Sequence, residues 1–257
     1  MTNLQTRGSA PTARRVRGPA YAAITECLRI QTTARPLPLL GRLFGQNPIL
    51  PDARSWYLGA MGEIHVAKVL SNLSTDWTVL RAIEPAAEPS DLVVGPAGAF
   101  LVATRNHSRQ RVWLGDDQLL VNGHRTNHLD DARHEARLAA RVLGLPVTAV
   151  LAIVDPATLA ITEPPRGVEV IAATQLESFL RRRKPRLTDA AVSEMLVMAE
   201  VSGTWSADVV DETLRYETRF ARLKAEVDAA AHRRRAWLVA AAIVVTSLIV
   251  AGAVLAK

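Results

Sequence analysis

The sequence predicts an α/β domain followed by a juxtamembrane helix and one transmembrane helix. Residues 55 to 202 contain short apolar strands and amphipathic helices in the order α-β-β-β-β-β-α-β-β-α-α, which indicates a sheet packed between helices in an α/β domain. Residues 147–154 are almost wholly apolar, as expected of a strand that is buried on both faces. Residues 236–256 contain no charged side chain, which indicates a segment that crosses a lipid bilayer.

The first 54 residues are predicted to form a flexible tail and an irregular arm. Residues 1–20 are rich in Thr, Gly, Ala, Pro and Arg and show no apolar periodicity, so we expect a flexible segment there. A short helix is predicted at 21–30, followed by apolar pieces interrupted by prolines. We expect this arm to pack on the α/β domain.

The α/β domain is predicted at 55–202, and its first helix begins at Ser55 as N-cap. Apolar residues then recur at three- and four-residue steps up to Leu73, which is the helical period. The other predicted elements are strands at 77–81, 92–94, 99–104, 111–114, 118–121, 147–154 and 168–172, and helices at 128–143, 173–183 and 188–201. Gly144 stands where a glycine commonly ends a helix.

The segment 236–256 has the length of a transmembrane helix, since about 1.5 Å per residue gives about 31 Å. Trp237 lies at its start, where an amphipathic ring favours the membrane interface. Arg233–Arg235 precede the segment and only Lys257 follows it. The positive-inside rule therefore predicts a single-pass protein of the cell membrane, with the N-terminal body in the cytoplasm and the C-terminus outside.

The juxtamembrane segment, 203–235, contains a charge-rich helix with a short heptad seam. The seam consists of Thr213, Tyr216, Phe220, Leu223, Val227 and Ala230. Two interpretations remain open. The helix either packs on its own domain or the lipid surface, or it forms a coiled-coil stalk that joins a homodimer through 209–230.

The bulk composition restricts the function. The 257 residues include 31 Lys and Arg against 25 Asp and Glu, a net charge of +6, and the basic clusters suit nucleic acid or anionic lipid. The single cysteine, Cys27, excludes an internal disulfide. No phosphate-binding Walker loop, dinucleotide fingerprint or Gly-x-Ser-x-Gly elbow is present. His124, His128 and His134 lack the ligand spacing of a zinc site, so we interpret them as exposed or capping residues.

Two motifs carry a family resemblance. Residues 59–63 read Gly-Ala-Met-Gly-Glu, and residues 91–106 read Asp-Leu-Val-Val-Gly-Pro-Ala-Gly-Ala-Phe-Leu-Val-Ala-Thr-Arg-Asn. With the Ala- and Leu-rich helix and apolar strand at 128–154, these motifs make the chain resemble the NERD (nuclease-related) domain family from about residue 55 to 180. The resemblance implies a restriction-endonuclease-like mixed sheet flanked by helices, and DNA processing.

The resemblance also assigns roles to single residues. Glu63 matches the acid of the family's first helix, and Asp91 matches its metal-binding Asp. Ala103 stands where the family has a second metal-binding carboxylate, and Arg105 where it has a catalytic Lys. Alanine offers Mg²⁺ no ligand, and arginine does not release a proton at neutral pH.

We therefore expect a membrane-anchored, catalytically degenerate module with no cofactor. It would bind nucleic acid through Arg105, His107, Arg109 and Arg111, or act as a scaffold for a partner. One alternative is an active Mg²⁺-dependent DNA nuclease that holds the metal with Asp91 and either Glu63 or a displaced acid. Glu84 and Glu88 are the candidates for that acid. The other alternative is a purely structural membrane scaffold.

Overall fold

The computed structural model describes residues 18–82, 90–202, 205–206 and 213–255. The chain forms two compact units. We call Met1–Ala20 with Leu58–Asp211 the sheet unit, and Tyr21–Tyr57 with Glu212–Lys257 the helical unit. The residues of the predicted arm belong to the same compact unit as the C-terminal helix. The predicted domain boundaries, and the packing of the arm on the α/β domain, stay predictions.

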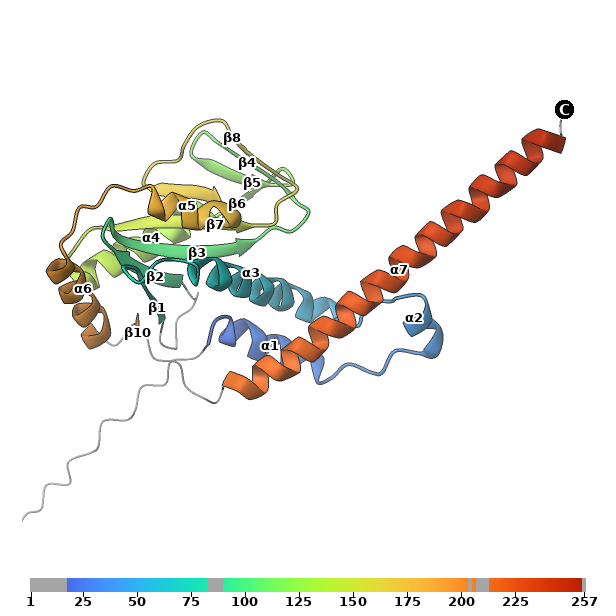
Figure 1. The fold of residues 1–257 in the computed structure, drawn as a ribbon, viewed down its shortest axis with the longest axis horizontal. Helices are drawn as coiled ribbons and strands as arrows, with labels where there is room; N and C mark the ends of the chain where they lie inside the picture. The colour runs from blue at the N-terminus through green and yellow to red at the C-terminus, as the bar shows by residue number, and fades with distance from the viewer. Residues whose placement is uncertain (1–17, 83–89, 203–204, 207–212, 256–257) are drawn as a thin grey trace, which may run out of the picture. The chain divides into compact units, whose positions relative to one another are not determined.

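The sheet unit is a mixed α/β structure, as predicted, built around a six-stranded sheet (Figure 1). Its strand order is β10-β1-β2-β3-β7-β9. The strands are β1 (Thr78–Ala82), β2 (Ser90–Gly95), β3 (Gly98–Asn106), β7 (Val147–Val154), β9 (Val168–Ala172) and β10 (Trp205–Ser206). β1, β2 and β3 are antiparallel neighbours, whereas β7 is parallel to both β3 and β9. This mixed sheet carries the hairpin motif at its centre.

Helices cover both faces of the six-stranded sheet. On one face lie α3 (Arg54–Leu70), which begins in the helical unit, and α5 (Leu176–Arg181), which follows the 3₁₀ turn η2 (Ala173–Gln175). On the other face lie α4 (His128–Leu143) and α6 (Asp189–Ser202). β7 contributes Val150 and Ala152 to the first layer and Leu151 and Ile153 to the second. The apolar run of β7 is thus explained by burial on both sides.

A second, smaller sheet was not predicted. Its strand order is β6-β5-β4-β8, with β4 at Arg111–Gly115, β5 at Gln118–Val121, β6 at His124–Thr126 and β8 at Thr158–Ile161. The inward side chains of β4 and β5 belong to the same apolar core as α4. Only the β4–β5 hairpin was predicted, and the structure confirms it.

The β2–β3 hairpin has two faces that we name by the helices that cover them. Asp91 is paired with Val102 and Ser90 with Ala103. Because successive residues of a strand point to opposite faces, Asp91 lies on the α3 face, whereas Ala103 and Arg105 lie on the α4 face. The core contacts agree, since Val102 packs with α3 residues and Ala103 with α4 residues.

The helical unit consists of α1 (Tyr21–Gln31), α2 (Leu39–Leu43), the 3₁₀ turn η1 (Pro51–Ala53) and the long helix α7 (Thr213–Leu255). α1 packs on α7, and the rings of Tyr21 and Tyr216 meet edge to face at 5.3 Å. Phe220, Leu223 and Ala230 of the heptad seam are buried. The seam therefore has an intramolecular role, and the homodimer through 209–230 stays a prediction, with 209–212 outside the described residues.

The predicted juxtamembrane and transmembrane helices form one continuous helix, α7. Within the described part of the chain, no helix is long and apolar enough to span a membrane. The predicted span, 236–256, ends outside the described residues, and the side chains from Val250 onward are likewise not described. The membrane crossing therefore stays a prediction.

Candidate functional site

Gly62 brings α3 close to the end of β3. A Cβ atom at this position would lie 3.1 Å from Cβ of Asn106 and 3.4 Å from Cγ2 of Thr104. The amide Nδ2 of Asn106 also donates a hydrogen bond to the carbonyl oxygen of Leu58, at 2.7 Å. The Gly-Glu pair of the first motif therefore has a physical role, since the glycine permits the approach that carries Glu63 to the sheet.

Glu63 and Asp91 form a pair of half-buried carboxyl groups on the α3 face. Burial, and next the charge of Asp91, raise the pKa of Glu63 to about 8, although the backbone N–H of Ala20 and the charge of Arg105 act against this shift. Burial raises the pKa of Asp91 to about 6, against the lowering effect of Arg81. At pH 7 Glu63 is therefore mostly protonated, and the pair carries about one negative charge.

A basic and aromatic group lies at the end of β3. Arg105 donates from Nε to Nδ1 of His128, at 3.3 Å, and from Nη1 to the carbonyl oxygen of Thr104, at 3.0 Å. The ring of His107 lies 5.3 Å from that of His128, and its Nδ1 is 3.0 Å from Oε1 of Gln110. We call Arg105, His107 and His128 the arginine–histidine group.

Both imidazoles of this group are neutral at pH 7. Burial, and next the charges of Arg105 and His107, lower the pKa of His128 to about 4. Burial also lowers the pKa of His107. The Nε2 atom of His107 is buried and has no hydrogen-bond partner among the described residues. The group thus combines one fixed positive charge with neutral rings that can donate or accept hydrogen bonds.

A carboxylate from α4 lies near the position of the missing one. Ser90, which is directly opposite Ala103 in the hairpin, donates a hydrogen bond from Oγ to Oε2 of Glu135. Glu135 follows His128 by seven residues, which is two helical turns, so both lie on the same side of α4. The α4 face therefore has an acid beside Ala103, supplied by a helix rather than by β3.

The residues do not fit the Mg²⁺ site that the family resemblance implies. Mg²⁺ is bound by hard oxygen ligands in octahedral geometry, so its carboxylates must converge on one point. Here Asp91 and Glu63 lie on the α3 face, whereas Glu135 and the position of Ala103 lie on the α4 face. Among the described residues, no group of three or more His, Cys, Asp or Glu side chains is arranged to hold a metal ion.

Sequence reasoning missed two of these residues. His128 was interpreted as exposed or capping, but it is half-buried against Arg105. Glu135 had a weak signal, since it lies in the later helix near the position where the family often has a Gln. The predicted displaced acids, Glu84 and Glu88, lie outside the described residues.

Two of the four predicted nucleic-acid-binding residues come together, and two stand apart, Arg109 on the loop that follows β3 and Arg111 at the start of β4. Arg105 and His107 belong to the arginine–histidine group, whereas Arg109 and Arg111 are exposed. The loop is held by Asn106, whose Oδ1 accepts hydrogen bonds from the backbone N–H and the hydroxyl of Ser108, at 3.0 and 2.6 Å. Arg109 adopts a left-handed conformation, with φ 63°.

The end of β3 and the loop after it therefore present a positively charged edge beside the carboxyl pair. Such an edge can bind phosphate groups, because arginine forms bidentate hydrogen bonds with their oxygens. Comparison with family models, with curated proteins and with solved structures finds no match to this chain.

Proposed function

We propose that this chain is a membrane-anchored member of the nuclease-related class that binds nucleic acid and does not cleave it. The observation that carries the proposal is the placement of the arginine–histidine group, Arg109 and Arg111 at one sheet edge, beside an incomplete set of carboxylates. The edge supplies positive charge for phosphates. The carboxylates are divided between the two faces of the sheet, so they do not supply the converging ligands that the metal ion of a nuclease requires.

The fold is consistent with this class. The resemblance to NERD domains implies a restriction-endonuclease-like core, in which the motif Asp lies on one strand of a hairpin and the catalytic residues on the next. The hairpin of β2 and β3, its parallel neighbour β7 and the helices on both faces support that assignment. The identity of the family remains part of the proposal.

The membrane anchor rests on α7. Large apolar side chains are exposed along it from Trp237 to Ile249, and the uncharged sequence continues to Ala256. Exposed apolar residues in such number are unfavourable in water but favourable in a bilayer. Arg233–Arg235 before this segment support a cytoplasmic position of the folded body in this proposal.

Salt-dependent DNA binding by the full chain in nanodiscs tests the proposal. Each phosphate contact lowers the slope of log affinity against log salt by about 0.9. We expect Arg109→Gln with Arg111→Gln to weaken binding about tenfold or more and to reduce the slope by about two contacts. Arg137→Gln with Arg141→Gln is the matched control, because both arginines are exposed on α4, away from this edge. Absence of binding at about 50 mM salt would contradict the proposal.

An active Mg²⁺-dependent nuclease is the second candidate, and Glu135 is the observation that favours it. The hydrogen bond from Ser90 holds the Glu135 carboxylate close to Ala103, whose side chain offers a metal ion no oxygen ligand. This alternative predicts DNA cleavage that chelation abolishes and that is lost in both Asp91→Asn and Glu135→Gln. Cleavage that survives both substitutions would argue against a site built from these two residues.

A further inference from the structure

α2 and the residue after it expose a cluster of large apolar side chains. The side chains of Leu39 and Leu40 are 84% and 67% exposed, and those of Leu43 and Phe44 are about half exposed. No residue of this five-residue helix is buried. Packing within the protein therefore does not explain its apolar sequence, and contiguous exposed apolar patches mark interaction sites.

Three contacts fix α2 beside the start of the apolar part of α7. The indole Nε1 of Trp237 donates a hydrogen bond to the carbonyl oxygen of Leu43, at 2.9 Å, and its ring lies 5.1 Å from that of Phe44. Gly45 adopts φ 72° and touches the backbone of α7. A Cβ at Gly45 would overlap the carbonyl oxygen of Ala230 and come within 2.7 Å of the Arg234 nitrogen. This contact requires glycine.

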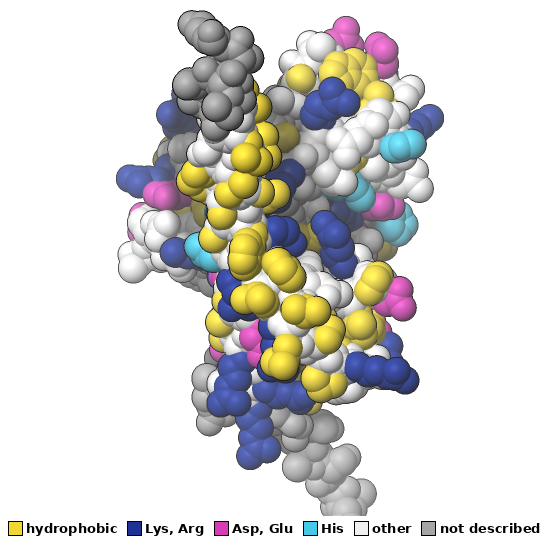
Figure 2. All heavy atoms as spheres, turned by 90° about the vertical axis from the view of Figure 1, so that its right-hand side faces the viewer, with side chains coloured by type: hydrophobic (Ala, Val, Ile, Leu, Met, Phe, Trp, Pro, Cys, Tyr) yellow, Lys and Arg dark blue, Asp and Glu magenta, His cyan; other side chains and the backbone are white. Residues whose placement is uncertain are grey.

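The apolar side chains of α2 are consequently continuous with those of α7. Figure 2 shows hydrophobic side chains gathered on the face that α2 and the C-terminal part of α7 present, bordered by Lys and Arg. Trp237 lies where these two surfaces meet. An aromatic ring with one polar atom is the side chain that proteins place at the boundary between lipid tails and headgroups.

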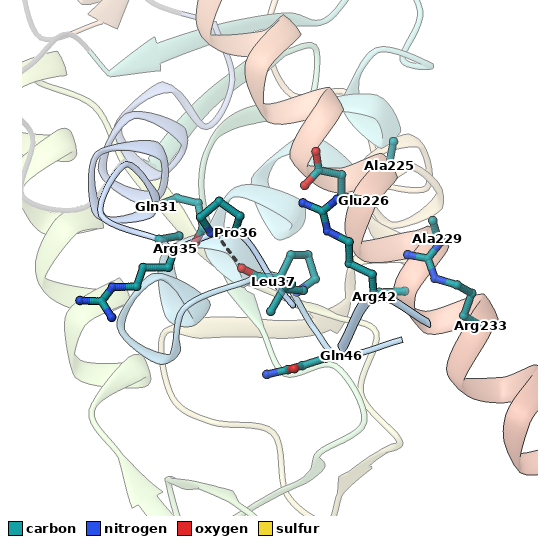
Figure 3. Close-up of a pocket in the computed structure, with 13 residues that line it drawn as sticks. Gln31, Arg35, Pro36, Leu37, Arg42, Gln46, Ala225, Glu226, Ala229 and Arg233 are labelled. Atoms are coloured by element: carbon teal, nitrogen blue, oxygen red, sulfur yellow. Dashed lines mark hydrogen bonds between the residues drawn. The ribbon is translucent and has the colours of Figure 1, made fainter. Parts of the chain in front are cut away.

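A basic cavity lies directly beside this apolar surface. It has a volume of about 640 Å³, and α2, α7 and the chain that joins α1 to α2 line it (Figure 3). Its charged lining residues are Arg35, Arg42, Arg233 and Glu226. Within the described residues, none of the three arginines forms an ion pair. The cavity therefore has an excess of positive charge that is available to an anion.

We propose that α2 inserts into the interfacial layer of the bilayer and that the cavity holds the headgroup phosphate of an anionic phospholipid. The apolar side chains and the arginines are adjacent, as are the acyl-chain and headgroup layers of a bilayer. Apolar side chains inserted between the acyl chains would therefore leave the arginines at the headgroups. Arg233 lies four residues, or one helical turn, before Trp237, so it is at headgroup depth when Trp237 is at the interface. The proposal rests on the membrane anchor of the proposed function.

Fluorescence quenching by spin-labelled lipid tests the depth of α2. The full chain, in a Cys27→Ala background, is labelled with an environment-sensitive dye at Leu40→Cys and reconstituted into nanodiscs that contain lipid with a nitroxide near the headgroup. A second set of nanodiscs carries the nitroxide near the end of the acyl chain, because Leu248 lies about 16 Å along the helix from Trp237, near the bilayer midplane. Leu248→Cys on α7 reports the anchor. Arg222→Cys is the negative control, because it is exposed and lies about 22 Å before Trp237 along the helix.

We expect the headgroup nitroxide to quench position 40, the acyl-chain nitroxide to quench position 248, and neither to quench position 222 appreciably. Quenching at 248 without quenching at 40 would overturn the inference and leave the anchor intact. Lack of quenching at 248 would overturn the anchor of the proposed function, and the inference with it. Circular dichroism of each variant checks that the labelled chain is folded.

The headgroup preference has its own test. Quenching at position 40 is compared for nitroxide-labelled phosphatidylglycerol and phosphatidylcholine at equal content. We expect a preference for phosphatidylglycerol that falls by about fivefold for each arginine removed in Arg35→Gln and Arg42→Gln. Arg219→Gln with Arg222→Gln, exposed on α7 outside the cavity, should retain it. An equal loss in both pairs, or no preference in the unmodified chain, would overturn the assignment of the cavity.

Discussion

The two faces of the β2–β3 hairpin hold different chemistry, although one short motif supplies both. On the α3 face, Asp91 meets Glu63, and the close pair retains a proton at pH 7. On the α4 face, Ala103 and Arg105 meet residues of α4, and the polar side chains there are neutral imidazoles, a guanidinium and the carboxyl group of Glu135. Residues that are close in sequence are thus separated by the thickness of a sheet, because the register decides which side each one takes.

The separation of the two faces implies that a carboxylate introduced at position 103 would not join Asp91 in one site. Asp91 is opposite Val102, one residue before the position where the family has its second carboxylate. A carboxylate at 103 would point into the apolar layer that packs on α4. Asp91 and a carboxylate at position 103 would therefore lie on opposite faces of the sheet and could not bind the same metal ion.

The largest effect is expected from Ala103→Glu combined with Arg105→Lys. Ala103 is buried among the apolar residues of the α4 face, and an unpaired buried charge costs about 3–5 kcal/mol. We expect that loss in the free energy of unfolding, measured by denaturant titration, and no gain of Mg²⁺-dependent cleavage. Arg105→Lys alone is the control. Unchanged stability together with new cleavage would show that positions 91 and 103 share one site.

The α3 face should produce a stability that falls as the pH rises. The folded-state pKa of Glu63 is raised from 4.5 to about 8, so the contribution of this group is fully present below pH 4.5 and is lost as the pH rises through 8. We compare the free energy of unfolding of Glu63→Gln with that of the unmodified chain. The difference should favour Glu63→Gln by on the order of 2 kcal/mol more at pH 8 than at pH 5, allowing for the partial exposure of Glu63. Denaturant titrations at both pH values measure the difference.

The same experiment on Asp91→Asn sharpens this prediction. The pKa of Asp91 is raised from 3.8 to about 6. The pH range over which its contribution to stability is lost is therefore narrower than that of Glu63 and lies at lower pH. Removing its charge should also lower the pKa of Glu63, because Asp91 is the second-largest cause of that shift. A loss of stability between pH 5 and pH 8 that is as large in Asp91→Asn as in the unmodified chain would show that the two carboxyls do not interact.

The α4 face should show a smaller dependence of the opposite sign. The folded-state pKa of His128 is lowered from 6.5 to about 4, so stability is lost as the pH falls from 6.5 through 4. His128→Gln should remove this loss, with an effect of about 1 kcal/mol at pH 4.5, reduced by the partial exposure of the ring. His134→Gln, exposed on the same helix, should leave the profile unchanged.

Much of the sheet unit could be predicted from the sequence, because its signals are local. α4, β7 and β9 have the predicted bounds, and Gly144 adopts the left-handed conformation with φ 64° that ends α4. β8 and α2 were missed for a shared reason. Both are four or five residues long and largely exposed, so neither has a buried face that would give it a recognisable period.

The site was only partly predictable for a different reason. Glu63, Asp91 and Arg105 are found from motifs that are contiguous in the sequence. The contacts of Arg105 with His128 and of Ser90 with Glu135 join residues 23 and 45 positions apart. They depend on how α4 lies across the sheet, and single-strand alternation gives no information on that packing or on the strand register.

Binding of Mn²⁺, followed by its electron paramagnetic resonance signal on the full chain, tests the separation of the two faces most directly. Mn²⁺ takes the same oxygen ligands as Mg²⁺. Because the two acids lie on opposite faces of the sheet, we expect no saturable binding that depends on them, and therefore identical titrations for the unmodified chain, Asp91→Asn and Glu135→Gln. Saturable binding that both substitutions abolish would place the two acids in one metal site and contradict their separation on opposite faces of the sheet.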